Sequence, residues 1–522
     1  MFITRHGITW EIEGDHPLHK YVNGDPAIVG PVRLLSARAE TGSAPSSSMV
    51  NPRPANEHGI SRGDGGYVAA LDVNNELPIT LRAGDSLVTC IDRAPGSTPQ
   101  VRAGAILTVV AEPPDPMAFR PGYAGPQKSM DVAVDFGKTA ADLVHPAPLV
   151  PTDGVSVPAF DDSKIERAWI DFRWEWAGRY LHPLDNMPDY GRDIGVLIGS
   201  AALSLCFRSP EDARQTLINL VQIGIDNYSC YKNGGAWRGD GGHGHGRMTP
   251  ILIAGAALGI PEMLKLDAKR FGEGMQTFFV EETSPGVINN GHGGYTNEQV
   301  GLPAWGFCHD KDPSRDDARW SENAGPYRFC CSANSWLGQV TALRLMGLLP
   351  AIEHEAWPAY LDRYIRRLKV EGLPGWWRYY DQPWHEQAYD ATRLADLPGT
   401  DSFGYGRHRL QADVPPSLRE GSFRVRIEGG NAFGKVVLAI SDKAKLIPDQ
   451  KPPLPAGIDF DGFCYLDDVD AIVDKDYNDG ATYDIPLPPM LHAGDRFYLQ
   501  AFVLTHDGVM RNTNALALTL LD

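Results

Sequence analysis

The change of sequence pattern near residues 163 and 393 constrains the fold of this chain most strongly. Between these points, apolar residues recur at the three- and four-residue spacing of helices that bury one face. Loops rich in Gly, Asn and aromatic residues separate the helical stretches. We therefore expect a helical central region over residues 160–395, with helices at Ile165–Leu181, Ile194–Phe207, Glu211–Tyr228, Pro250–Leu258, Glu262–Phe279, Asn297–Trp305, Asn334–Leu349 and Glu355–Val370.

The regions on either side carry a pattern typical of β-strands. Residues 1–150 are rich in Val, Gly, Pro and Thr, and Leu77–Thr89 predicts a strand, a turn and a second strand. Leu149–Phe160 has the composition of a linker. The strands expected in residues 404–522 are Phe423–Ile427, Lys435–Ile440, Phe497–Thr505 and Ala515–Leu521. The chain is thus expected to be a multidomain α+β protein with a β-sandwich at each end.

A weak internal repeat runs through the helical region. Ile198–Leu203, Ile253–Leu258 and Gly338–Leu343 share a pattern of small residues. Each is interpreted as the inner helix of a helical hairpin that packs closely against its neighbours. Repeated hairpins close into an α/α toroid or stack into a solenoid, and we expect the toroid.

Charge and hydropathy limit the partners. The formal net charge of −18 argues against nucleic acid, whose phosphates need a basic face. No apolar run approaches the ~18 residues that span a bilayer, so no membrane partner is expected. Met1–His6 lacks the apolar stretch of a signal peptide, which leaves a cytoplasmic or virion-associated location, or an exported one for a trimmed chain. The seven cysteines are expected to be mostly buried free thiols.

Trp237–Arg247 reads W-R-G-D-G-G-H-G-H-G-R and is the strongest candidate site. Its glycines let a ligand approach closely, and Thr249-Pro250 predicts that a helix begins just after it. A helix N-terminus attracts an anion. His243 and His245 are candidate general bases, because a histidine exchanges protons near neutral pH. A further set is expected to bind substrate, with guanidinium groups that clamp a carboxylate and an indole that stacks on a sugar: Arg238, Arg247 and Trp237.

A second glycine-rich loop, Asn289–Gln299, repeats this design. Tyr295 is a candidate proton donor or acceptor. Asn289, Asn290 and His292 are candidate substrate-binding residues, and Thr296 with Gln299 has the spacing of a helix capping box.

Two more polar loops precede expected helices. Tyr190 and Arg192 come before Ile194–Phe207, and the loop from Tyr327 to Asn334 leads into Asn334–Leu349. If alternate helices form the inner ring of a toroid, their N-termini share one side. The four loops would then converge on one cleft.

Metal binding and hydrolysis are the competing chemistries at these loops. The candidate metal ligands are His243, His245, His292 and Cys308–Asp310. Because their spacing matches no familiar zinc site, no metal is expected. A glycoside hydrolase would need a pair of carboxylates, for which the candidates are Asp189, Asp240, Glu298 and Glu322.

The region Ser163–Arg393 resembles the polysaccharide lyases built on an α/α toroid, of the alginate-, glucuronan- or heparinoid-cleaving kind. The resemblance rests on the helical-hairpin pattern, the loops rich in Asn, His, Arg and Tyr, and the flanking β regions. It implies that Asn290 and Arg247 neutralise a uronate carboxylate, that His243 or His245 is the base, and that Tyr295 is the acid.

The sequence therefore predicts a lyase that cleaves an acidic, uronic-acid-containing polysaccharide by β-elimination, without a cofactor. Two alternatives stay open. One is a glycoside hydrolase on the same toroid, in which the histidines bind substrate. The other is a glycan-binding or structural protein without catalytic activity, such as a phage-tail component.

Overall fold

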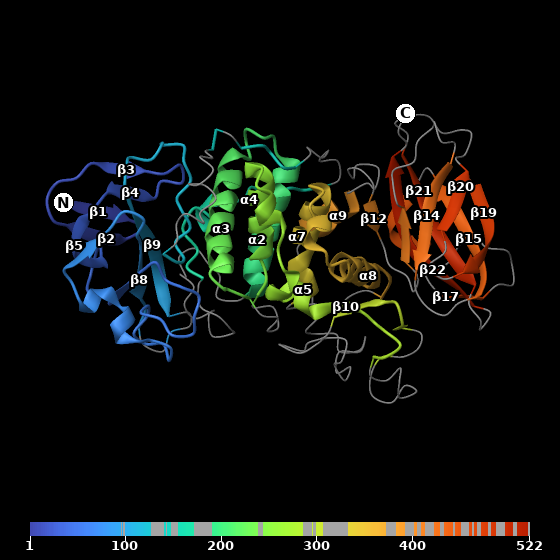
Figure 1. Cartoon of the computed structure of the whole chain (residues 1–522), viewed down its shortest axis with the longest axis horizontal. Coiled ribbons are helices and arrows are strands. Elements are labelled where there is room, and N and C mark those ends of the chain that lie inside the picture. The colour runs from blue at the N-terminus through green and yellow to red at the C-terminus, as the bar shows by residue number, and fades with distance from the viewer. Residues whose placement is uncertain are drawn as a thin grey trace. The chain divides into compact units, whose positions relative to one another are not determined.

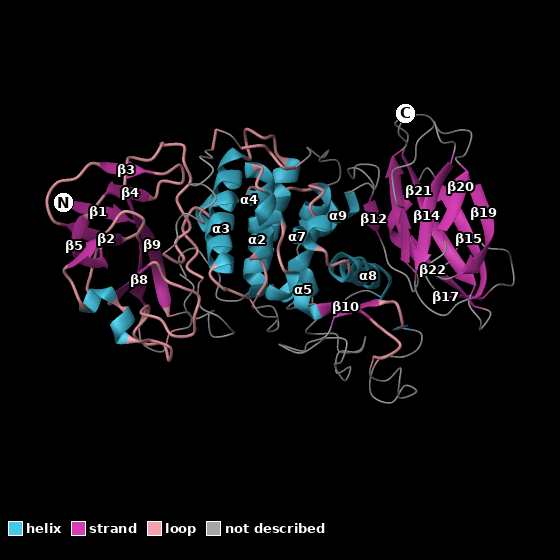
Figure 2. Cartoon of the chain, in the orientation of Figure 1, coloured by secondary structure: helices cyan, strands magenta, loops and turns pink. Residues whose placement is uncertain are grey.

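The computed structural model describes residues 1–94, 97, 100–126, 140–141, 143–147, 155–171, 191–237, 244–284, 295, 299–305, 332–371 and 383–391, and after residue 400 the strands named below. Contacts divide the chain into two compact units. Unit 1 is Met1–Met275 with Asn334–Ile352, and unit 2 is Gln276–Ala333 with Glu353–Asp522. Figure 1 labels their helices and strands, and Figure 2 separates them by type.

Unit 1 begins with two β-sheets. The first has the order β1(Phe2–Arg5), β2(Ile8–Ile12), β5(Val32–Ala39), β7(Ile79–Leu81), all antiparallel. The second has the order β3(Leu18–Lys20), β4(Pro26–Val29), β9(Val101–Val110), β8(Ser86–Asp92), β6(Ser46–Val50), in which β4 and β9 are parallel. The predicted strand–turn–strand of Leu77–Thr89 is confirmed as β7 and β8.

Both sheets contribute to one hydrophobic core. Ile8, Trp10 and Leu34 come from the first sheet, and Leu87 and Leu107 come from the second. The alternating runs that predicted strands thus place one face of each sheet in a common interior. One hydrogen bond joins the two sheets inside this core, where Trp10 Nε1 donates to Thr89 Oγ1 over 2.9 Å.

The long helices in the described part of unit 1 are α2(Gly191–Phe207), α3(Arg214–Lys232), α4(Met248–Leu258) and α7(Asn334–Leu345). They stand side by side in Figure 1, from green to gold. Helix α2 packs on α7, and α3 packs on α4. A Cβ on Gly199 would lie 3.1 Å from Gly338 Cα, so two of the three repeated small-residue segments meet at the α2–α7 contact.

A buried ion cluster joins the sheets to α3. Arg120 Nε donates to Asp25 Oδ2 over 2.8 Å, and Arg120 Nη2 donates to Asp226 Oδ2 over 2.5 Å. All three side chains are at most 1% exposed. Gln222 on α3 also exchanges two hydrogen bonds with the Arg120 backbone, so this loop is fixed to the helix from both sides.

The predicted helix Ile165–Leu181 is wrong over its described part. A short 3₁₀ turn, Asp162–Lys164, precedes it, but residues 168–171 have no regular structure. Trp169 and Ile170 are buried, which explains the apolar spacing. The N–H of Asp171 donates to Tyr123 Oη over 2.8 Å, whereas a helix would direct it to a carbonyl four residues earlier.

Two other helix predictions are also wrong. Asn297–Trp305 ends as strand β11(Pro303–Trp305), after Gly301 takes a left-handed φ of 81° that ends helical structure. Glu262–Phe279 is divided into 3₁₀ turns Pro261–Leu264 and Ala268–Arg270, helix α5(Gly272–Gln276) and strand β10(Thr277–Phe279). Strands β10 and β11 pair antiparallel, and pairing of this kind over distance is not encoded in local periodicity.

Unit 2 contains helices α8(Ala356–Glu371) and α9(Pro383–Ala391), and α8 packs on β10 and β11. Its remaining strands are β12(Asp401–Phe403), β13(Arg409–Ala412), β14(Ser422–Glu428), β15(Phe433–Ser441), β16(Ala444–Asp449), β17(Asp459–Asp461), β18(Cys464–Leu466), β19(Ala471–Asn478), β20(Thr482–Pro486), β21(Arg496–Leu504) and β22(Val509–Thr519).

These strands form a main sheet β12-β22-β21-β15-β19 with β17 beside β22, and smaller sheets β13-β14-β20 and β16-β18. The predicted strands at residues 423–427 and 435–440 lie within β14 and β15, and those at 497–505 and 515–521 correspond to β21 and β22. The chain is thus a multidomain α+β protein. The helical region of residues 160–395 is shared between the two units.

Candidate functional site

The described end of the glycine-rich loop leads directly into α4. This helix begins at Met248, two residues earlier than the predicted Pro250, and its N-cap position is Arg247. Thr249, the second residue of the helix, donates from its Oγ1 to Gln339 Oε1 on α7 over 2.9 Å. His245 and Arg247 still lie immediately before the helix. Arg238 and His243 lie outside the described residues.

Asp171 is the centre of the polar contacts at this point. Its Oδ2 accepts from Arg247 Nε over 2.7 Å and from Trp237 Nε1 over 2.9 Å. Asp171, Arg247 and Trp237 are 5%, 1% and 6% exposed, so this is a buried ion pair with a third donor. Charge-assisted bonds in a low-dielectric interior fix geometry strongly. The Arg247 charge is therefore directed at Asp171.

His245 is held by two neighbours on different segments. Its Nδ1 accepts from Trp336 Nε1 of α7 over 2.9 Å, and its carbonyl accepts from Arg247 Nη1 over 2.6 Å. The imidazole and indole rings meet edge to face, with centroids 5.4 Å apart at 88°. The side chain of His245 is fully buried. A Cβ on Gly195 of α2 would approach His245 Cβ to 3.0 Å, so α2 packs tightly against this residue.

The backbone of Arg247 is fixed as well, since Asn227 Nδ2 of α3 donates to its carbonyl over 3.2 Å. Asn334, the first residue of α7, is 4% exposed. Three of the predicted site residues, Trp237, His245 and Arg247, thus come together in unit 1 between α2, α3 and α7. Asp171 and Trp336 connect them.

Two other predicted site residues, Arg192 and Tyr295, make different contacts. Arg192 Nε donates to Asp193 Oδ1 over 2.7 Å at the start of α2. Tyr295 belongs to unit 2, is 2% exposed, and packs edge to face against Phe278 with centroids 5.4 Å apart. Five others lie outside the described residues: Tyr190, Asn289, Asn290, His292 and Tyr327.

Sequence reasoning missed Asp171 as a site residue. The signal was available, because Ala168–Asp171 places one carboxylate at the end of an apolar run. A buried carboxylate needs a cation or several donors. The sequence gives no signal for Trp336, because its donor role depends on the packing of α2 on α7.

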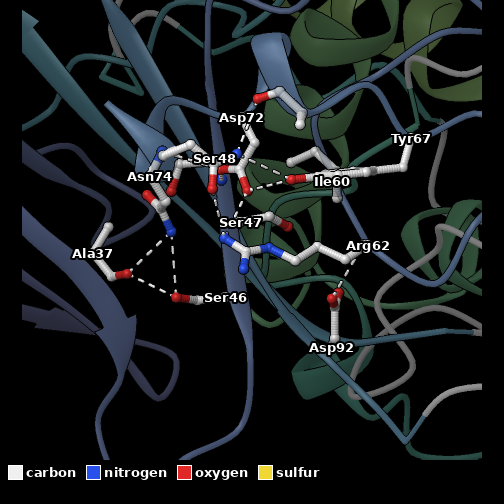
Figure 3. Close-up of polar contacts among 12 residues, drawn as sticks. Ala37, Ser46, Ser47, Ser48, Ile60, Arg62, Tyr67, Asp72, Asn74 and Asp92 are labelled. Atoms are coloured by element: carbon white, nitrogen blue, oxygen red, sulfur yellow. Dashed lines mark hydrogen bonds and ion pairs between the residues drawn. The ribbon is translucent and has the colours of Figure 1, made fainter. Parts of the chain in front are cut away.

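A second polar cluster lies in the first half of unit 1 (Figure 3). Asp72 is fully buried and accepts from four donors, namely the backbone N–H groups of Ser48 and Asn74, Tyr67 Oη and Arg62 Nη2, over 2.9–3.1 Å. These hydrogen bonds to Asp72 hold the loop that follows β6 against that strand. Burial raises the pKa of nearby Asp92 to about 6, although the N–H of Arg62 donates to it.

This loop contains Gly59–Gly63, G-I-S-R-G, a spacing that resembles a serine-nucleophile turn, and the sequence reasoning did not single it out. Ser61 has a left-handed φ of 61°. Its Oγ donates to Gln100 Oε1 over 3.1 Å, and His58 Nε2 lies 2.9 Å from Asp64 Oδ1. A Cβ on Gly59 would lie 2.2 Å from Leu71 C. The glycine is required by close packing, and these contacts support a structural role for the loop.

Within the described residues, no three His, Cys, Asp or Glu side chains group closely enough to hold a metal ion. No helix in the same part of the chain combines the length and apolar character that a membrane span needs. Comparison with protein-family models, with curated proteins and with solved structures finds no match for this chain.

Proposed function

We propose that this protein is a polysaccharide lyase that cleaves a uronic-acid-containing polysaccharide by β-elimination. One observation carries the proposal furthest: the glycine-rich loop is fixed at its described end by Asp171, Arg247, His245 and Trp336. Loops that carry acid–base and anion-binding groups must hold them in a fixed geometry to catalyse proton transfer.

The proposal includes an α/α toroid over residues 160–395 and a β-sandwich on each side of it. The pairs α2–α7 and α3–α4 support it, because close helix pairs with glycine at the contact are the units of such a toroid. The common core of the two N-terminal sheets supports the first sandwich.

In the proposed reaction, a base removes the proton next to the uronate carboxylate. The electron pair of that C–H bond becomes a C=C bond as the neighbouring C–O bond breaks, and the leaving oxygen takes a proton. Neutralisation of the carboxylate favours the first step. The proposal assigns the base to His243 of the glycine-rich loop. Arg247, paired with Asp171, orients the loop.

The test is incubation of the full chain with alginate, glucuronan, pectate and glycosaminoglycans while ultraviolet absorbance of the unsaturated product is followed. The proposal predicts a rise on at least one polymer. New reducing ends without that absorbance would show hydrolysis in its place. If neither signal develops on any polymer, the lyase proposal fails, and the result favours a glycan-binding or structural protein without catalytic activity.

A further inference from the structure

The contact between Trp336 and His245 determines which imidazole nitrogen carries the proton. An indole N–H can only donate a hydrogen bond. Because Trp336 Nε1 donates to His245 Nδ1 over 2.9 Å, Nδ1 must present its lone pair. A neutral imidazole then has its proton on Nε2.

A general base needs an unprotonated nitrogen that reaches the substrate. In His245 the lone pair of Nδ1 is taken by Trp336, and Nε2 carries the proton. The side chain is also 0% exposed, and its carbonyl is tied to Arg247. Two independent observations, the hydrogen bond and the burial, therefore disfavour proton abstraction by this residue.

We propose that Trp336 is a positioning residue that holds His245 as the Nε2–H tautomer, so that His245 anchors the glycine-rich loop through the bonds it accepts from Trp336 and Arg247 and is not the base. The assignment of roles rests on the proposed lyase function, whereas the tautomer does not. The anchor is built from three segments of unit 1: the residues before α4, helix α7, and Asp171, which is connected to the loop by its ion pair with Arg247.

The tautomer can be measured without any activity. In long-range ¹H–¹⁵N spectra of the full chain labelled at histidine nitrogen, protonated and unprotonated ring nitrogens are well separated, and the loss of one set of peaks in His245→Gln assigns the residue. We expect one neutral species with Nε2 protonated. In Trp336→Phe, which keeps an aromatic ring but has no N–H, we expect the peaks of His245 to move toward a mixture of tautomers.

A spectrum of the unmodified protein with His245 protonated on Nδ1 would overturn the proposal, and so would peaks that do not move in Trp336→Phe. The tautomer is measured on the unmodified protein, and His245→Gln serves only to assign the peaks. Unchanged peaks of the other histidines in that variant show that it keeps the fold.

The role of His245 is tested by turnover on a polymer that the unmodified protein cleaves. His245→Gln places an amide N–H near the position of Nε2 but cannot act as a base. We expect kcat/KM within about tenfold of the unmodified value and an unchanged acidic limb of the pH profile, whereas loss of a general base costs about a hundredfold or more. A loss of that size with a normal fold would contradict the anchor role.

The two proposals fail separately. If no polymer is cleaved by the unmodified protein, the lyase function is wrong, and the spectra alone still decide the tautomer. If cleavage occurs but His245 Nδ1 carries the proton, the lyase proposal is supported and the role proposed for Trp336 is wrong.

Discussion

Asp171 and Asp72 are 5% and 0% exposed, and each accepts hydrogen bonds from several donors. Asp171 receives a guanidinium and an indole, and Asp72 receives two backbone N–H groups, a phenol and a guanidinium. A buried carboxylate whose oxygens all have donors fixes the segments that supply them. The same carboxylate with a donor removed leaves a charge in a medium that solvates it poorly.

Substitution of Asp171 by Asn should therefore destabilise unit 1 strongly. It leaves Arg247 buried without its counter-ion, for which we expect a loss of about 3–5 kcal/mol in the free energy of unfolding. Urea denaturation followed by tryptophan fluorescence measures this loss.

The matched control is Asp193→Asn at the start of α2. Asp193 also pairs with an arginine, but its side chain is 41% exposed. Solvent screens that pair, so we expect a loss of about 1 kcal/mol or less. Equal losses in the two variants would show that the Asp171–Arg247 contact does not hold the loop.

At the residue scale, the sequence predicted part of the candidate site. Trp237, His245 and Arg247 do lie together, because glycines and a helix start bring them close along the chain. Their partners could not be predicted. Asp171 is more than sixty residues away, and Trp336 reaches His245 only through the packing of α2 on α7.

At the scale of elements, the long helices with uninterrupted apolar spacing were predicted within a few residues. The predicted helices at 194–207 and 334–349 correspond to α2 and α7. The failures share a cause, because buried irregular segments such as Ala168–Asp171 and short paired strands such as β11 also show clustered apolar residues. In such segments tertiary hydrogen bonds decide the conformation.

Glycine at the α3–α4 contact gives a prediction for these elements. A Cβ on Gly224 would lie 2.2 Å from the Pro250 carbonyl oxygen, a backbone atom that cannot move aside freely. We expect Gly224→Ala to force the helices apart and to destabilise unit 1 by about 1–3 kcal/mol. Thermal unfolding measures the change.

Gly65→Ala is the control for this substitution. No atom lies within 4 Å of the position of its Cβ, and its φ is not left-handed. We expect the melting temperature to stay the same or rise slightly, since alanine restricts the unfolded chain. If Gly224→Ala has the same melting temperature as Gly65→Ala, α3 and α4 are not packed at that distance.

At the scale of the whole molecule, each of the two units contains both β-sheets and helices. In unit 1 the Asp25–Arg120–Asp226 cluster connects the sheets to α3. Asp25 is flanked by two guanidinium groups, from Arg120 and Arg5, which hold its pKa below its usual range in spite of burial. Burial raises the pKa of Asp226 to about 6, because the charge and hydrogen bond of Arg120 offset it only in part.

The raised pKa of Asp226 gives a pH dependence with a definite sign. The folded state binds this proton more tightly than the unfolded state, so the contribution of Asp226 to stability grows as pH falls from about 7 to about 4. Burial lowers the pKa of His6 to about 4, which has the opposite effect in the same range. The test therefore compares the pH dependence of the free energy of unfolding between the unmodified protein and Asp226→Asn.

We expect the stability of the unmodified protein, relative to Asp226→Asn, to rise by up to about 3 kcal/mol between pH 7 and pH 4, from a shift of roughly two pKa units. Urea denaturation at several pH values measures this difference. Parallel profiles for the two proteins would show that Asp226 does not bind a proton in this range.

The proposed β-elimination is tested most directly by the products of cleavage in water enriched in heavy oxygen, reduced at once with borohydride and weighed by mass spectrometry. Elimination adds no water across the broken bond. We therefore predict unlabelled products, one of which is lighter by one water than a hydrolysis product and contains the new double bond. Products that carry heavy oxygen at the new end, without that mass deficit, would contradict the account.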